Sequence, residues 1–157
     1  MPLYSTTSFS GPTSSARTAR RPFILIFPAV ISLLHLVKPI GFELDDRHVR
    51  RSGMDYWRKI EYRIHENWQD FLSAKGDAPM YLYSTKAEKN YWDAPMEDGS
   101  YLVFGSEGHG LPQEIHDAFE PYFYTIPMPG NFSRSLNLAN STAVVIYEGL
   151  RRRFLKG

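Results

Sequence analysis

Polar residues crowd the start of the last apolar stretch of the chain, SRSLNLANSTAVVIYE. Within that stretch the side chains that could do chemistry are Ser133, Arg134, Ser135, Asn137 and Asn140. Helix capping accounts for one or two such groups, and five exceed that need. A helix N-terminus with spare hydroxyl and amide groups can hold a carboxylate or orient a hydroxyl nucleophile. The alternative is capping combined with a surface turn.

The glycine-rich segment GSEGHG is the second candidate for chemistry, and it follows the apolar run YLVF. Gly105, Gly108 and Gly110 would let main-chain N–H and C=O groups approach a flat ring or a polar ligand directly. The segment fits neither a Rossmann nor a P-loop pattern. By spacing alone, a plain strand-to-helix turn and a ligand site are about equally expected here.

Both segments belong to a chain in which short apolar runs alternate with helical patterns. The runs LHLVKPI, MYLYST, YLVF and YFYTIPM indicate strands, and DDRHVRRSG, NWQDFLSA, LPQEIHDAF and residues 137–154 indicate helices. We therefore predict an α/β fold with a mainly parallel sheet and helices on both faces. On the last helix, one apolar face is expected to hold Leu138, Val145, Ile146, Leu150 and Phe154.

This fold predicts where a ligand site would lie. Ligands of such sheets bind at the carboxyl ends of the strands. Three loops are therefore expected to converge: YSTK near Tyr83, GSEGHG after Phe104, and PMPGNFSRSLN after Ile126.

Composition narrows the class of protein. The chain has 157 residues, 43% hydrophobic and 22% charged, as in an ordinary soluble globular domain. It has no cysteine, so disulfides, thiolate metal sites and cysteine nucleophiles are excluded. Its five histidines show no metal-ligand spacing, and we predict no metal site.

The N-terminal part differs from the rest of the chain. Residues 1–42 contain no Asp or Glu but many Ser, Thr and Arg residues, which is typical of an organelle transit segment. We assign residues 1–22 to an N-terminal segment that is a possible leader, and 23–157 to the globular domain. The expected location is the cytoplasm, or an organelle matrix if a leader is removed. The apolar run FILIFPAVISLLHLV is too short for a membrane span and contains Pro28, so we expect a strand, or a strand and a helix.

Four motifs, in order, carry a family likeness: PIGFELDD…RRSGMDYW, YLVFGSEGHGLP, IPM and SRSLNLANSTAVVIYE. Over about residues 35–152 the chain resembles the SPOUT superfamily, and within it the tRNA (cytidine/uridine wobble) 2′-O-methyltransferases. The resemblance implies a C-terminal trefoil knot, which is an exception to the usual rule against knots. It also implies S-adenosylmethionine as methyl donor and a homodimer that holds the anticodon stem-loop of tRNA.

The resemblance further implies roles for single residues. The loops at Tyr83, Gly105 and Ile126 match the loops that hold S-adenosylmethionine in the family. Ser135 matches a family serine at the cofactor and ribose, and Asn137 matches the neighbouring asparagine of the same motif. Together with Arg17, Ser135 and Asn137 form the expected catalytic set. Glu107 is expected to organise its loop, and His109 to be a surface residue.

The first motif departs from the family pattern N-T-G-x-x-A-R. In GPTSSARTAR, Pro12 replaces the asparagine, Ser14 replaces the glycine, and Arg17 is the nearest catalytic arginine. Either the N-terminal stretch is altered, or part of the catalytic motif is lost. The second case predicts a catalytically impaired cofactor- or RNA-binding protein.

Arginines offer contacts for RNA phosphates. Arg47, Arg50 and Arg51 are the predicted set, and residues 151–153 are a weaker one. A solvated helix face is the alternative interpretation of the first cluster.

Overall fold

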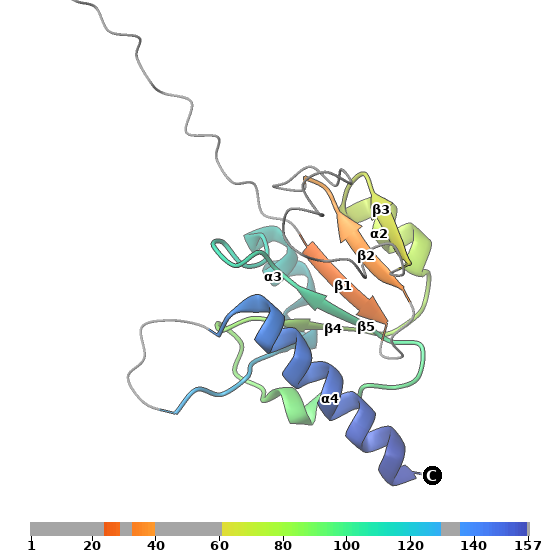
Figure 1. The fold of residues 1–157 in the computed structure, drawn as a ribbon. Helices are drawn as coiled ribbons and strands as arrows, with labels where there is room; N and C mark the ends of the chain where they lie inside the picture. Colours follow the sequence, from red (N-terminus) through yellow and green to blue (C-terminus); the bar gives the residue numbers. More distant parts are fainter. Residues whose placement is uncertain (1–23, 29–32, 40–60, 130–135, 157) are drawn as a thin grey trace, which may run out of the picture.

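The computed structural model describes residues 24–28, 33–39, 61–129 and 136–156 (Figure 1). Arg17, the Arg47, Arg50 and Arg51 cluster, and Ser135 lie outside the described residues, as does the helix predicted over DDRHVRRSG.

The core of the structure is a six-stranded sheet of order β3-β2-β1-β5-β4-β6. Its strands are β1 (Ile24–Pro28), β2 (Leu34–Val37), β3 (Tyr62–His65), β4 (Met80–Tyr83), β5 (Tyr101–Phe104) and β6 (Phe123–Tyr124). The pairs β2–β3, β4–β5 and β4–β6 are parallel, whereas β1 is antiparallel to both β2 and β5. Among the described strands β1 alone runs in the opposite direction, so the predicted α/β fold with a mainly parallel sheet is confirmed.

The direction of β1 follows from its short connection. Only residues 29–33 separate β1 from β2. A parallel crossover needs a dozen or more residues, whereas a short link is compatible with antiparallel neighbours. The strand predicted within FILIFPAVISLLHLV is therefore present, and it occupies the middle of the sheet between β2 and β5.

Three α-helices accompany the sheet in the described part of the chain: α2 (Trp68–Lys75), α3 (Gln113–Phe119) and α4 (Leu138–Lys156). Asn67 caps α2 because its side-chain oxygen accepts the Asp70 N–H at 2.9 Å. Two 3₁₀ turns, η2 (Tyr91–Asp93) and η3 (Glu120–Tyr122), complete the described elements. None of the helices described is both long and apolar enough to span a bilayer.

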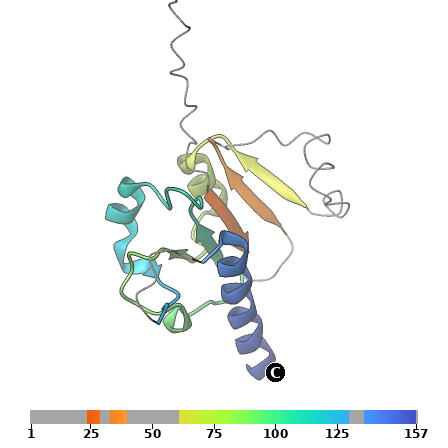
Figure 2. The same ribbon diagram turned by 60° about the vertical axis from the view of Figure 1, so that its left-hand side comes forward.

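Alternation along the strands divides the core into two layers. Leu82 and Val103 pack with Phe71 of α2 and Ile115 of α3 on one face of the sheet. On the other face the aromatic ends of β4 and β5 pack with Val145 of α4. In Figure 2, α4 and α3 accordingly lie on different sides of the strands.

Two expectations about the elements need correction. Phe154 was expected on the buried face of the last helix, but it is 81% exposed, whereas Val145 is fully buried. The last turns of α4 extend past the strands in Figure 1, so there is no sheet for Phe154 to pack against. The short edge strand β3 (Tyr62–His65) was not predicted, since three of its four residues are exposed and it lacks an apolar run. The trefoil knot stays a prediction, because residues 130–135 lie outside the described residues.

Candidate functional site

The carboxyl ends of three parallel strands meet at one cavity. Strands β4, β5 and β6 run in the same direction, so the loops that follow them emerge at the same edge of the sheet. These loops line a cavity of about 290 Å³ together with the start of α4. Tyr83, Gly105 and Ile126 are all part of its wall. The structure thus brings together three segments that are distant in the sequence, while their contacts to a cofactor stay a prediction.

The wall of the cavity combines apolar and polar groups. Apolar surface comes from the side chains of Phe104, Leu111, Ile126, Leu136 and Leu138. Hydroxyl groups come from Ser84, Thr85, Ser106, Thr125 and Ser141. A cavity with this mixture can take a ligand that has a flat apolar ring at one end and polar groups elsewhere.

The glycine loop after β5 is closed on itself. Ser106 donates its N–H to the oxygen of Gly110 at 3.3 Å and accepts the Gly110 N–H at 2.8 Å. A Cβ atom on Gly105 would lie 2.1 Å from the carbonyl carbon of Gly110 and 2.3 Å from the nitrogen of Leu111. The packing of its own loop is therefore sufficient reason for glycine at position 105, while a contact of Gly105 with a cofactor stays a prediction. A Cβ on Gly108 would meet no atom within 4 Å.

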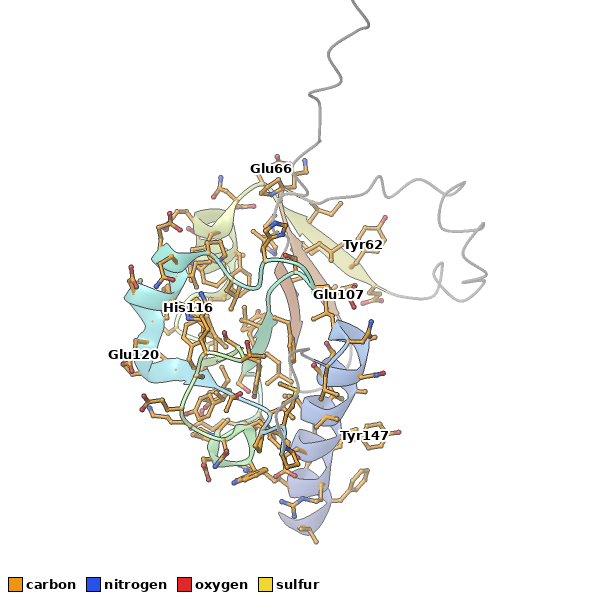
Figure 3. All side chains as sticks on the ribbon, turned by 90° about the vertical axis from the view of Figure 1, so that its left-hand side faces the viewer. Tyr62, Glu66, Glu107, His116, Glu120 and Tyr147 are labelled. Atoms are coloured by element: carbon orange, nitrogen blue, oxygen red, sulfur yellow. The ribbon has the colours of Figure 1, made fainter. Side chains whose placement is uncertain are left out.

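Glu107 connects this loop to the last helix. Its carboxylate accepts hydrogen bonds from the side-chain amide of Asn137 and from the N–H of Leu138, the latter at 3.2 Å. The side-chain oxygen of Asn137 in turn accepts the Ala139 N–H at 2.9 Å. Figure 3 shows Glu107 beside the first turn of α4. Asn137 therefore stands next to the cavity rim, held in place by Glu107, and the polar groups at this helix start include real caps.

Ser106 carries a buried hydroxyl with no hydrogen-bond partner among the described residues. Ser106 is also one of the residues of the cavity wall. An unpaired buried hydroxyl costs free energy, so a polar ligand atom at this position would be stabilising. Nothing in GSEGHG distinguished Ser106 from a simple turn residue.

The tyrosine at the cavity cannot act as a base at neutral pH. The ring of Tyr83 stacks on Phe104, with centroids 5.0 Å apart and planes 17° apart. Its hydroxyl is buried without a partner in the described part of the chain. Burial first, and then the neighbouring Tyr124 and Tyr81, raise the pKa of Tyr83 above its usual value, so the phenol keeps its proton.

His116 also lines the cavity, although no motif in the sequence singles it out. Its ring stacks on Phe123 with centroids 4.1 Å apart. Burial, followed by the charge of Lys86, lowers the pKa of His116, so the imidazole is neutral at pH 7. Its position results from the packing of α3 on β6, which no local pattern encodes. His109 is exposed, as expected, at the tip of the glycine loop.

Histidines elsewhere in the described residues form no metal site. No group of three His, Asp or Glu side chains in this part of the chain could hold a metal ion. The two most buried histidines instead pair with each other, Nδ1 of His35 lying 2.8 Å from Nε2 of His65.

Comparison with known proteins adds the family context. Residues 29–147 match the SpoU rRNA Methylase family. A tRNA (cytidine(34)-2′-O)-methyltransferase of Methylovorus glucosotrophus is 41% identical over 125 residues, 79% of this chain and 80% of that protein. A protein of the same name from Burkholderia pseudomallei is 40% identical over 128 residues, 79% of this chain and 81% of its own.

A solved structure that concerns the 2-OH methylation of C/U34 on tRNA superposes with a TM-score of 0.69 at 38% identity. The superposition covers 76% of this chain and 78% of that one. The matched family region starts at residue 29, so the segment that contains Arg17 precedes it.

Proposed function

Because this chain belongs to the SpoU rRNA Methylase family, we propose that it methylates the ribose 2′-hydroxyl of nucleotide 34, the wobble position of tRNA, with S-adenosylmethionine as the methyl donor. The observation that carries the proposal is the cavity where the loops after β4, β5 and β6 meet the start of α4. The relatives named above, which are 41% and 40% identical to this chain over the aligned residues, supply the reaction and the substrate.

The residues at the cavity fit the methyl donor. The closed loop from Gly105 to Gly110 forms part of the wall, and the buried Ser106 hydroxyl behind it has no hydrogen-bond partner among the described residues. Apolar side chains such as Leu111 and Leu138 suit an adenine ring. A volume of about 290 Å³ is close to the lower end of the usual range for ligand sites, roughly 300–1,000 Å³.

The chemistry asks mainly for positioning. S-adenosylmethionine supplies a methyl group already activated by its positively charged sulfur. The protein must hold the ribose oxygen in line with that methyl group and assist the loss of the hydroxyl proton. In this proposal Ser135 and Asn137 orient the ribose. The bond that Asn137 donates to Glu107 and the one that it accepts from the Ala139 N–H keep its side chain fixed.

Arg17 is the proposed cation beside the 2′-hydroxyl. A guanidinium stays protonated because its pKa lies above about 12, so it acts by charge and hydrogen bonding. Tyr83, in the cavity wall, holds its proton at neutral pH because burial raises its pKa, and it offers no alternative base.

The proposed assembly is a homodimer whose two subunits together hold the anticodon stem-loop. Its support is the apolar surface at the end of α4, where Tyr147 is 72%, Phe154 81% and Leu155 72% exposed. Their spacing of seven and eight residues puts all three on one side of the helix. Figure 3 shows Tyr147 directed away from the rest of the chain. Arg47, Arg50 and Arg51 stay the proposed contacts to RNA phosphates.

A transfer assay tests the reaction. Purified protein is incubated with methyl-labelled S-adenosylmethionine and tRNA, and the methylated nucleotide is mapped. We expect label at the 2′-oxygen of nucleotide 34, and none on a tRNA carrying 2′-deoxycytidine there. Absence of transfer to any RNA would contradict the proposal.

The altered first motif favours a second candidate, a cofactor- or RNA-binding protein without transfer activity. Pro12 and Ser14 stand where the family pattern has asparagine and glycine. Calorimetry with S-adenosylhomocysteine separates the two, because binding is expected for both candidates and label transfer only for the enzyme.

A further inference from the structure

Lys86 lies in the tight turn that follows β4, at the wall of the cavity. The hydroxyl oxygen of Ser84 accepts the Lys86 N–H at 3.2 Å, and the Ser84 carbonyl accepts the Ala87 N–H at 3.3 Å. Ser84 also donates its own N–H to the carbonyl of Tyr124 at 3.0 Å. The backbone of Lys86 is therefore fixed to the end of the sheet and not free to drift from the cavity.

The ammonium group of Lys86 differs from those of the other described lysines. Three of them have partners within 2.8 Å: Lys38 at Glu66, Lys75 at the carbonyls of Gly76 and Ala78, and Lys89 at the carbonyl of Pro121. The Lys86 ammonium has no hydrogen-bond or ion-pair partner among the residues that the structure describes.

Lys86 also supplies a positive charge to the cavity wall. It is the single lysine or arginine among the described lining residues. The carboxylate of Glu107, also in the wall, is already engaged by Asn137 and Leu138. His116 is neutral at pH 7 because of its burial and the nearby ammonium. Lys86 is thus a cation in the wall of a polar cavity, with no direct partner among the described residues, which favours an anionic ligand group beside it.

We propose that Lys86 binds the carboxylate at the amino-acid end of the methyl donor, an inference that rests on the proposed function. The ligand class is a nucleoside thioether or sulfonium that carries an α-amino acid. A lysine ammonium suits this task, because it is a compact charge on a long stem and can meet a carboxylate that stays partly in water. Since the carboxylate marks one end of the ligand, holding it at the turn after β4 fixes the direction in which the ligand lies in the cavity.

Two ligands that differ only in the carboxylate test this contact. S-adenosylhomocysteine and its decarboxylated analogue, which keeps the adenosine, the sulfur and the amine, are titrated into the full chain by calorimetry. With the unaltered protein we expect the analogue to bind about tenfold more weakly, as for the loss of one charge-assisted hydrogen bond. Lys86→Met keeps much of the aliphatic stem but lacks the charge. This variant should bind S-adenosylhomocysteine about tenfold more weakly than the unaltered protein, and the difference in affinity between the two ligands should disappear.

Matched variants complete the experiment. Lys86→Arg retains the cation and should preserve the preference for the carboxylate. Lys38→Ala removes a cation that already pairs with Glu66 outside the cavity wall, and it should behave like the unaltered protein. Thermal unfolding of each variant checks that it is folded. If Lys86→Met is not folded, Lys86→Gln replaces it as the uncharged variant.

The outcomes separate this inference from the proposed function. If the unaltered protein binds S-adenosylhomocysteine but Lys86→Met retains the full preference over the analogue, the inference is overturned and the proposed function stands. Equal binding of both ligands by the unaltered protein overturns it as well. If the unaltered protein binds neither ligand, both the proposed function and the inference are contradicted.

Discussion

The carboxylate of Glu107 accepts a hydrogen bond from the side-chain amide of Asn137, thirty residues further along the chain. The same oxygen accepts the backbone N–H of Leu138 at 3.2 Å. A negative charge at this position also interacts favourably with the positive end of the α4 dipole. The loop that forms one wall of the cavity is thereby tied to the helix start that forms another wall, so the two walls keep a fixed relation.

Glu107→Ala should lower both stability and ligand affinity. It removes both acceptor contacts at the α4 start, and loss of such a cap costs about 1 kcal/mol. For a domain of this size that lowers Tm by roughly 2–4 °C. S-adenosylhomocysteine should bind more weakly because the two cavity walls separate. The Tm and the affinity of Glu107→Gln should lie between those of the unaltered protein and Glu107→Ala, since its amide oxygen can still accept hydrogen bonds.

Thermal unfolding and calorimetry on the same samples provide the measurement for Glu107. Glu88→Gln is the matched control, because Glu88 is exposed outside the cavity wall and its side chain makes no hydrogen bond among the described residues. A Glu107→Ala protein with unchanged Tm and unchanged affinity would show that the loop and the helix do not depend on this contact.

Two glycines of one loop should respond differently to the same substitution. Gly105→Ala places a Cβ 2.1 Å from the Gly110 backbone, which must then move, so we expect a loss of about 1–3 kcal/mol in the free energy of unfolding. The Cβ atom of Gly108→Ala meets nothing within 4 Å, so this substitution should change the free energy of unfolding by less than about 0.5 kcal/mol. Urea unfolding of both variants measures the difference. Equal stabilities would contradict the closed-loop geometry.

Much of the fold was predictable because its signals are local. The run from Tyr101 to Phe104 is uniformly apolar and forms β5 with those bounds, and the spacing of Trp68, Phe71 and Leu72 correctly indicates α2. The strand β3 was missed because an exposed edge strand needs no apolar run. The exposure of Phe154 was missed because helical periodicity does not say where the sheet ends.

The site was predictable only in part, because its hydrogen-bond and ring partners depend on long-range packing. Parallel strands fix which loops converge, so the sequence indicated the places of Tyr83, Gly105 and Ile126 around the cavity. The partner of each group depends on long-range packing. Neither the bond from Asn137 to Glu107 nor the position of His116 over Phe123 follows from any spacing in the sequence.

The exposed end of α4 should control the oligomeric state. Tyr147 and Phe154 are 72% and 81% exposed in the single chain, so replacing both with serine removes apolar surface without opening the core. We expect the unaltered protein to be a dimer and Tyr147→Ser/Phe154→Ser to be largely a monomer at the same micromolar concentration. Light scattering reports the mass. The control is Tyr122→Ser, which changes an exposed tyrosine of η3 and should remain a dimer. A monomeric unaltered protein would refute the proposed assembly.

The buried pair His35 and His65 should make the protein sensitive to mild acid. Their rings are nearly parallel with centroids 5.1 Å apart, and the His35 ring also makes edge contacts with Phe71 of α2 and Tyr101 of β5. Burial first, then the charges of His65 and Arg63, lower the pKa of His35 to about 4. The carboxylate of Asp70 lies 3.4 Å from Nδ1 of His65 on the far side of the pair.

The sign of the effect follows from proton binding in the two states. A histidine in the unfolded chain titrates near its ordinary pKa of 6.5, so between pH 6.5 and 4 the unfolded state binds more protons than the folded one. The stabilisation from a neutral His35 is fully present above pH 6.5 and is lost as the pH falls towards 4. Its size is roughly 3 kcal/mol, since one pKa unit corresponds to about 1.4 kcal/mol.

Substitution of His35 isolates its share of this pH dependence. His35→Asn keeps a hydrogen-bonding side chain facing His65 but cannot titrate, so its free energy of unfolding should decline less between pH 6.5 and 4.5 than that of the unaltered protein. Urea unfolding at half-unit pH steps gives the two slopes. His109→Asn removes an exposed histidine and should retain the original slope. Parallel slopes for His35→Asn and the unaltered protein would mean that the buried pair does not govern acid sensitivity and that carboxylates elsewhere do.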